Sequence, residues 1–316
     1  PLLSWLSEHS DPGASYVFSG WLDAGGNPAV MEEPIRHWLA AHAADIGANY
    51  VFTSWLDAHG DPAAVEEPVR PWSGDHATEP TAAFVYRSWL DAHGDPSLVE
   101  EPIRRWLDAH AIDIGAGFVF RSWLDAHGGR SLVEEPIRRW LAEHASTADA
   151  SYVFRGWLDA QGDPGFIEEP VRRWLTGYAS DVDASYVLRC WLDAQGDLAV
   201  IEEPVRRWLA EHASSADASY VLCGWLGAQG DPALVEETMR RWLAEHAAED
   251  DASYVFRSWL DRNGELEVVE EPIRRWIIEH ATSADAKYVF RGWLDRNGDH
   301  SLVEKPFRQW LAQHAS

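Results

Sequence analysis

The chain has 316 residues, of which 46% are hydrophobic and 12% aromatic, so it holds enough apolar material for a large buried core. Acidic residues outnumber basic ones by 52 to 26, and the resulting net charge of −26 argues against nucleic acid as a partner, because phosphate binding depends on Lys and Arg. No apolar run approaches the roughly 20 residues of a membrane span, so no membrane partner is expected either.

Tryptophan recurs at a fixed interval along the sequence. Trp89 and Trp106 are 17 residues apart, and the same interval holds from Trp21 to Trp310, while Trp5 is off by one residue. The flanks alternate between two kinds, "EEPIRRWLAEHA" and "ASYVFRGWLDA", so the repeat has 34 residues in two related halves. A repeat of this kind predicts an array in which each copy packs on its neighbours.

The first half of the repeat, represented by residues 163–179, carries the pattern of an amphipathic helix. Ile167, Val171 and Trp174 fall on one stripe, which predicts one buried face. Asp163 stands at the expected N-cap and Pro164 at the first helical position, where a missing amide hydrogen costs nothing.

A proline four residues before the first-half tryptophan complicates this helix. Inside a helix, Pro170 would remove one backbone hydrogen bond and press on the preceding turn. Either the helix continues through a kink, or a short first turn precedes a helix that begins near Glu169, and the sequence leaves both alternatives open. The proline recurs at positions 34, 68, 102, 136, 170, 204, 272 and 306, with Thr238 as the exception.

The second half, represented by residues 146–162, predicts another helix. Asp149 is the expected N-cap, and Gly162 is the expected C′ residue in a left-handed conformation. A small residue, Gly156 in this copy, precedes each second-half tryptophan. It predicts a close helix crossing in which a neighbouring aromatic such as Tyr152 fills the notch.

The fold class that follows is all-α. We expect a right-handed α–α superhelical solenoid of about nine repeats of the helix-turn-helix type and about 19 helices, forming a single domain over residues 1–316. The copy at 65–83 contains Pro71 and should be the least stable part and a hinge. No copy at either end is evidently more polar, so the chain is expected to be a fragment of a longer one or to self-associate through uncapped ends.

One tryptophan per helix is expected to form the core. These residues are Trp21, Trp38, Trp55, Trp89, Trp106, Trp123, Trp140, Trp157, Trp174, Trp191, Trp208, Trp225, Trp242, Trp259, Trp276, Trp293 and Trp310, and Trp72 follows the same interval.

Helical hairpins at this period resemble the α-solenoid class that includes tetratricopeptide and HEAT-type repeats, and the resemblance covers the entire chain. The details depart from both patterns, since each half carries Trp-Leu and the proline precedes the first-half tryptophan. The resemblance implies a helical-hairpin architecture and the binding of proteins or peptides along a concave surface, without implying a particular ligand.

The chemistry-bearing residues are repeated, whereas an enzyme needs a single site with distinct environments for its groups. Paired glutamates such as Glu168-Glu169 are expected on a solvated face, and the histidines four residues after the first-half tryptophans at helix ends. Asp295, Asn297 and Asp299 imitate the start of a calcium loop, but the later ligand positions do not match. We therefore expect no enzyme activity, no cofactor and no metal.

The leading functional hypothesis is a non-catalytic scaffold that binds a partner protein or peptide. A ladder of arginines is the candidate binding surface for an acidic partner, and it comprises Arg104, Arg138, Arg172, Arg206, Arg240 and Arg274. The alternative for each arginine is pairing with the glutamate four residues earlier. Two other hypotheses are a self-assembling structural array and the sensor arm of a larger signalling protein.

The two cysteines, Cys190 and Cys223, have neither disulfide nor metal spacing. They are expected to be buried, reduced thiols, which favours a cytoplasmic location.

Overall fold

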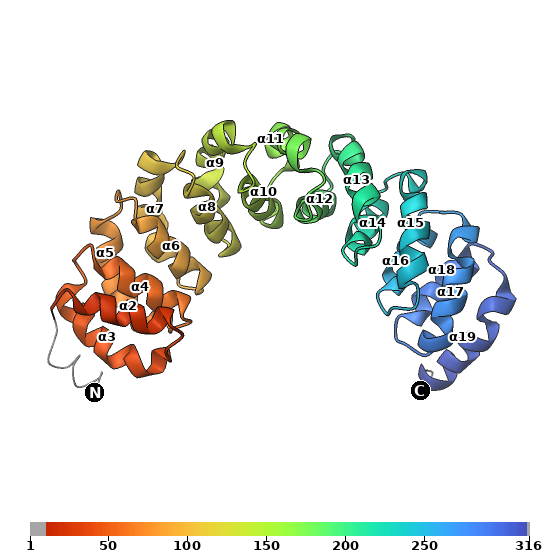
Figure 1. Cartoon of the computed structure of the whole chain (residues 1–316), viewed down its shortest axis with the longest axis horizontal. Coiled ribbons are helices and arrows are strands. Elements are labelled where there is room, and N and C mark those ends of the chain that lie inside the picture. The colour runs from red at the N-terminus through yellow and green to blue at the C-terminus, as the bar shows by residue number, and fades with distance from the viewer. Residues whose placement is uncertain (1–10, 315–316) are drawn as a thin grey trace. The chain divides into compact units, whose positions relative to one another are not determined.

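The computed structural model describes residues 11–314, and the secondary structure in this range consists of 18 α-helices and one short 3-10 helix (Figure 1). The chain is therefore a helical repeat array with two helices in each 34-residue copy. Trp5 and its predicted helix lie outside the described residues.

The array alternates helices of two lengths. Eight long helices of 15 residues are α3 (Pro28–His42), α7 (Pro96–His110), α9 (Arg130–His144), α11 (Pro164–Tyr178), α13 (Leu198–His212), α15 (Pro232–His246), α17 (Leu266–His280) and α19 (His300–His314). In the copy between α3 and α7, the short 3-10 helix η1 (Pro62–Ala64) and α5 (Glu66–Asp75) stand in place of a long helix. Nine short helices of 10 residues are α2 (Ala14–Asp23), α4 (Ala48–Asp57), α6 (Ala82–Asp91), α8 (Ala116–Asp125), α10 (Ala150–Asp159), α12 (Ala184–Asp193), α14 (Ala218–Gly227), α16 (Ala252–Asp261) and α18 (Ala286–Asp295).

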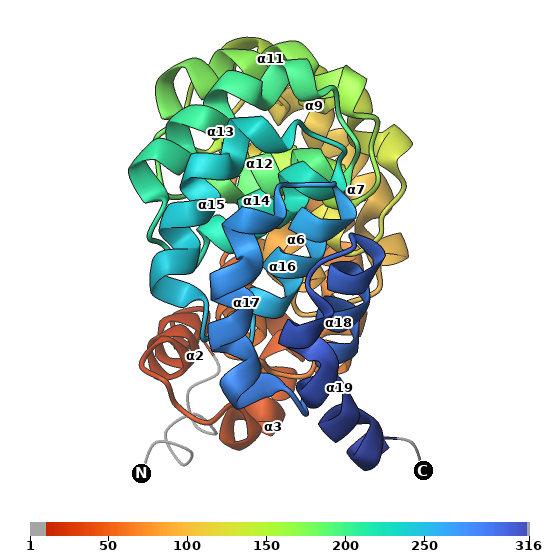
Figure 2. The same ribbon diagram turned by 90° about the vertical axis from the view of Figure 1, so that its right-hand side faces the viewer.

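The chain divides into two compact units, Pro1–Gly162 and Asp163–Ser316. Within each unit, short helices pack on neighbouring short helices and long helices on neighbouring long helices. Figure 2 shows this for α13, α15 and α17 on one side and α14, α16 and α18 on the other. The short helices approach one another more closely than the long helices do, so each unit bends toward its short-helix side.

The recurrent proline lies inside a continuous long helix in most copies. In α7, for example, Pro102 is the seventh of 15 residues, and α3, α9, α11, α13, α17 and α19 have the same arrangement. The other alternative occurs once, where the chain breaks at Val65 (φ −120°) and α5 begins at Glu66. Breaking there places Pro68 in the first turn of α5, where an amide hydrogen has no intrahelical acceptor. Because this copy also contains Pro71, a continuous helix would have lost two backbone hydrogen bonds.

The capping prediction is confirmed at Asp163 and in most other long helices, whereas α9 and α17 have no side-chain cap. The Asp163 side chain accepts a hydrogen bond from the backbone N–H of Gly165, and Pro164 follows at the first helical position. The prediction for the short helices is wrong. Asp149 has helical backbone angles and makes no capping hydrogen bond with its side chain, because the preceding loop already turns helically and its carbonyls accept the first amides.

The turn after each short helix also differs from the prediction. The left-handed residue in the turn after α10 is Gln161 (φ 59°), and Gly162 is the residue after it. The Gly162 amide bonds to the Trp157 carbonyl and the Gln161 amide to the Leu158 carbonyl, which is a Schellman motif with glutamine at C′. Glycine is required at 162 for space, since a Cβ there would lie 2.3 Å from Cε2 of Trp157.

The core contains one indole from nearly every helix, and each ring also fixes a loop. In the short helices, Trp89 Nε1 donates to the carbonyl of Asp95, the N-cap residue of α7, at 3.0 Å. In the long helices, Trp106 Nε1 donates to the carbonyl of Glu79, in the loop of the preceding copy, at 3.0 Å. The same two bonds recur in other copies, so the tryptophans connect neighbouring elements as well as filling the core.

Two predicted core tryptophans are not fully buried. Trp21 is 37% exposed and Trp310 is partly exposed. They lie in α2 and α19, the first and last described helices, where packing within the described residues comes from one direction along the array. Trp72 is fully buried even though α5 is shortened.

The small residues before the short-helix tryptophans do sit at close helix contacts, but tyrosines do not fill them. A Cβ added to Gly156 would lie 3.4 Å from the Cα of Arg121 in α8, and one added to Gly224 would lie 3.1 Å from Leu192 in α12. The notch is therefore occupied by the preceding short helix itself, and Tyr152 points to solvent.

Candidate interaction surfaces

The arginine ladder predicted from the sequence lies on the exposed side of the long helices, with each arginine paired inside its own helix. Arg104 Nη2 lies 3.2 Å from Glu100 Oε1, and its Nε lies 3.2 Å from Glu101 Oε2. The same pairing with the glutamate four residues earlier occurs at Arg138, Arg172, Arg206, Arg240 and Arg274. Exposed pairs of this kind add little stability, but they offset the positive charge that the ladder would offer to an acidic partner.

The second arginine of the "RR" pair reaches the preceding copy in two places. Arg105 Nη1 donates to the carbonyl of Gly74, and Arg275 Nη2 donates to the carbonyl of Leu243. Gly74 lies near the C-terminal end of α5 and Leu243 in the last turn of α15, where a positive charge is favoured. These arginines have a structural role between repeats.

The histidines at the ends of the long helices also connect neighbouring copies. The His110 ring stacks on Trp106 with centroids 5.0 Å apart, its Nε2 lies 2.9 Å from the carbonyl of Thr78, and its Nδ1 lies 2.7 Å from Asp113 Oδ2. Burial lowers the pKa of His110, but the hydrogen bonds to Thr78 and Asp113 outweigh it, so the pKa lies above 6.5. The pKa of His246 is raised in the same way, with Glu249 in place of Asp113.

A row of exposed aromatic side chains on the short helices was missed by the sequence analysis. This aromatic row takes the third residue of each short helix and recurs every 34 residues, with exposed fractions from 37% to 70%. Its members are Tyr16, Tyr50, Phe84, Phe118, Tyr152, Tyr186, Tyr220, Tyr254 and Tyr288. The spacing contained a signal, since five residues from ring to tryptophan is a rotation of about 140° around the helix, away from the buried stripe.

Neighbouring members of the aromatic row contact one another and cationic side chains. The rings of Phe118 and Tyr152 have centroids 6.4 Å apart, and the guanidinium carbon of Arg121 lies 5.4 Å from the Tyr152 centroid. In the other unit, Arg257 lies 4.8 Å from the Tyr288 centroid. Guanidinium groups above aromatic faces form cation–π contacts, so this surface offers flat apolar area beside charge.

A second row of side chains is formed by aspartates, one at the last residue of each short helix except α14. Arg121 pairs with Asp125 in its own helix at 3.3 Å, and comparable pairs occur in α12, α16 and α18. In α6, however, Arg87 pairs with Asp57 of the preceding short helix at 3.1 Å. Asp91, the last residue of α6, makes no ion pair with any residue that the structure describes.

The helix α14 interrupts both the arginines and the aspartates of the short helices. Cys223 stands in place of the arginine and Gly227 in place of the aspartate. The helices α2 and α4 also lack the arginine, with Ser19 and Thr53 in its place, but they keep the aspartate as Asp23 and Asp57. Cys223 is partly exposed, so the prediction of burial holds only for Cys190.

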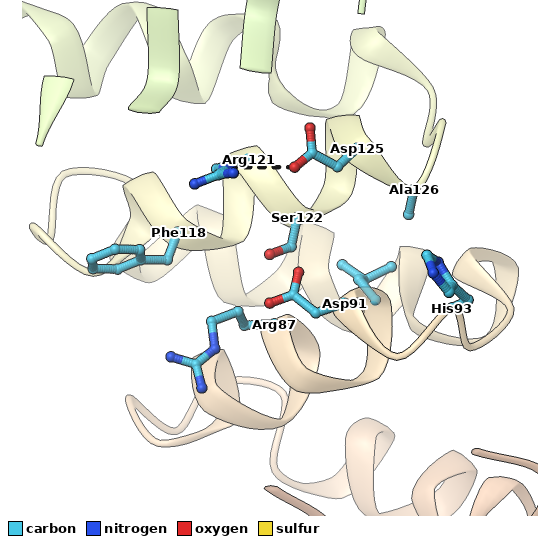
Figure 3. Close-up of a pocket in the computed structure, with 9 residues that line it drawn as sticks. Arg87, Asp91, His93, Phe118, Arg121, Ser122, Asp125 and Ala126 are labelled. Carbon is cyan, nitrogen blue, oxygen red and sulfur yellow. Dashed lines mark hydrogen bonds and ion pairs between the residues drawn. The ribbon is translucent and has the colours of Figure 1, made fainter. Parts of the chain in front are cut away.

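A pocket of about 360 Å³ lies between α6 and α8 on the short-helix side (Figure 3). Leu90 and Ala126 contribute apolar surface, and Phe118 of the aromatic row stands at one end. Its charged lining residues are Arg87, Asp91, Arg121 and Asp125, and the imidazole of His93 also lines it. In Figure 3 the Asp91 carboxylate points into the space between the two helices.

A second pocket, of about 500 Å³, lies between α3 and the broken copy formed by η1 and α5. Its lining is mostly Leu, Ala and Pro, including Pro68 and Pro71, with Arg36 and Glu67 as charged residues. It is located on the long-helix side and owes its position to the irregular helix start at Glu66.

The residues that imitated a calcium loop have structural roles. Asp295 pairs with Arg291, Asn297 is the left-handed turn residue (φ 57°), and Asp299 caps α19 through the Ser301 amide. No group of three or more His, Cys, Asp or Glu side chains within residues 11–314 is arranged to hold a metal ion. In the same range, every helix is too short or too polar to cross a membrane.

Comparison with known proteins adds no assignment. No protein-family model matches the chain, and no curated protein sequence matches it.

Proposed function

We propose that the chain is a non-catalytic scaffold that binds a partner protein or peptide along its short-helix side. The observation that carries this proposal is the aromatic row, which keeps a large ring exposed on every described short helix. Exposed aromatic residues are enriched in protein interfaces because they supply contact area at a low cost in conformational entropy. Isolated exposed apolar residues are common, whereas exposed rings that contact one another on neighbouring helices form the kind of contiguous apolar surface that marks interaction sites.

The aromatic row is a better candidate than the arginine ladder for physical reasons. Each ladder arginine already pairs with at least one glutamate, so an acidic partner must compete with a carboxylate held in the same helix. The rings of the aromatic row have no such competitor for their exposed faces, apart from the flanking arginines. The short helices also line the side toward which each unit bends, where one partner segment can contact several helices.

The proposal agrees with the resemblance to tetratricopeptide and HEAT-type arrays, which bind proteins along a concave surface. Repetition of the candidate groups favours binding over catalysis, since every helix of a row offers nearly the same chemistry. Self-assembly and a sensor arm remain alternative hypotheses, and the same experiment addresses the first of them.

The test compares two variants in unit Asp163–Ser316. One changes Tyr186, Tyr220 and Tyr254 to Ser on the short helices, and the other changes Arg172, Arg206 and Arg240 to Glu on the long helices. Circular dichroism first establishes that both variants keep the helix content of the parent chain. Each chain is then immobilised and exposed to a lysate of its source.

The proposal expects partners that the parent chain and the arginine variant retain and the tyrosine variant loses. The opposite pattern, with loss only in the arginine variant, would refute it and restore the ladder as the binding surface. Retention of the chain's own copies alone, with concentration-dependent sedimentation, would favour self-assembly.

A further inference from the structure

We infer that the pocket between α6 and α8 binds a cationic side chain, lysine or arginine, from a basic extended segment of the partner. The inference rests on the proposed function, because it names the chemistry of the partner on the same short-helix side. It is carried by the charge of the pocket, its position at helix ends and the neighbouring aromatic ring.

The charge of the pocket is unbalanced once its ion pairs are taken into account. Arg121 is paired with Asp125 inside the pocket, and Arg87 is paired with Asp57 on α4. Both positive groups are therefore engaged, while the Asp91 carboxylate has no cationic partner among the described residues. A positive guest would complete this arrangement.

The backbone adds to the same preference. Asp91 is the last residue of α6, and Asp57 and Asp125 end α4 and α8. The C-terminal end of a helix carries the negative end of its dipole, so a carboxylate there is locally unfavourable and a cation is favoured. A cation bound at Asp91 would relieve the repulsion.

The aromatic ring and the apolar lining fit the stem and head of a long basic side chain. Phe118 is 45% exposed and stands at one end of the pocket (Figure 3). A guanidinium or ammonium group gains from the face of such a ring, while Leu90 and Ala126 offer surface to its methylenes. The pocket volume of about 360 Å³ accommodates a side chain of this size.

The charge of the whole chain points in the same direction. A net charge of −26 attracts basic segments over long distances and repels acidic ones. The inference thus replaces the acidic partner expected from the arginine ladder with a basic one.

The experiment measures binding of three labelled peptides to the full chain by fluorescence anisotropy. In each peptide a variable residue recurs between glycine and serine residues. It is arginine in the first peptide, glutamine in the second and glutamate in the third. The arginine peptide should bind, and Asp91→Asn should weaken it by about tenfold, the effect of losing one charge-assisted hydrogen bond. Asp108→Asn, which makes the same charge change on the exposed side of α7, should leave the affinity unchanged.

A second pair of variants tests the pocket in the opposite direction. Arg121→Gln leaves Asp125 without its partner and should strengthen binding of the arginine peptide. Arg104→Gln makes the same charge change on the long-helix side and should have no effect.

Equal effects within either pair of variants would overturn the inference, because they would show general attraction to an acidic chain. Binding of the glutamate peptide in preference to the arginine peptide would also overturn it. If the arginine peptide does not bind while the tyrosine variant still loses its partners, the pocket inference fails and the proposed function stands. If the pocket variants behave as expected while the tyrosine variant loses nothing, the proposed aromatic row fails instead.

Discussion

Replacing Gly94 with alanine should destabilise the turn between α6 and α7. The sequence predicts glycine here as the left-handed C′ residue, whereas the structure gives that conformation to His93 (φ 62°). A Cβ on Gly94 would instead lie 2.2 Å from Cε2 and 2.5 Å from Cδ2 of Trp89. The substitution therefore creates a collision with a buried ring and introduces no backbone strain.

The magnitude follows from what the ring can do in response. Trp89 is 1% exposed and its Nε1 holds the carbonyl of Asp95, so the indole has no free volume to move into. Overpacking of a buried site typically costs about 1–3 kcal/mol, and a displaced indole also weakens its hydrogen bond, worth about 1 kcal/mol. We expect a loss of about 2–3 kcal/mol in the free energy of local opening.

Amide hydrogen exchange followed by mass spectrometry is the suitable assay, because repeats interact with their nearest neighbours and the effect should be local. A loss of about 2 kcal/mol corresponds to roughly thirtyfold faster exchange in α6 and α7. Gly115→Ala is the matched control, since a Cβ there meets nothing within 4 Å. His93→Gly should leave exchange unchanged or slow it, because glycine adopts the left-handed conformation without strain.

Two results would refute this reasoning. Unchanged exchange in the Gly94 variant would mean that the indole is not tightly confined. Faster exchange in the His93→Gly variant than in the Gly94→Ala variant would mean that loss of the C′ side chain matters more than contact with the ring.

Three further predictions concern the proline, the indole and the histidine of the long helices. Pro102→Ala should slow exchange in α7, because it restores a missing backbone hydrogen bond, whereas Pro96→Ala at the first helical position should not; equal effects would contradict this. Trp106→Phe should cost about 1–3 kcal/mol in urea unfolding by leaving a carbonyl without its donor, and Trp310→Phe should cost less because water can reach that partly exposed position. Because the pKa of His110 is raised in the fold, its contribution to stability is complete below about pH 6.5 and is lost as the pH rises through the folded value. The urea midpoint should therefore fall with rising pH, and His110→Gln should reduce that dependence; an identical pH dependence in the variant would exclude the histidine as its source.

Local signals in the sequence were sufficient to predict the long helices. The stripe that contains Trp174, the cap at Asp163 and the adjacent Pro164 act over a few residues, and they specify where a long helix begins and which side it buries. The interval between tryptophans then fixes the order of helices along the array, because each copy packs on its neighbours.

Other features of the fold and of the candidate site were not predictable from local sequence signals. Whether Gln161 or Gly162 takes the left-handed conformation depends on where the Trp157 ring lies against the turn, which no local pattern specifies. At the recurrent proline the helix breaks in the copy that also contains Pro71 and continues in copies such as α7. The candidate site depended most on tertiary structure, since the lone charge of Asp91 exists only because Arg87 reaches across to the preceding short helix. Such contacts join residues 27 to 32 positions apart, so they become visible only when neighbouring repeats are placed side by side.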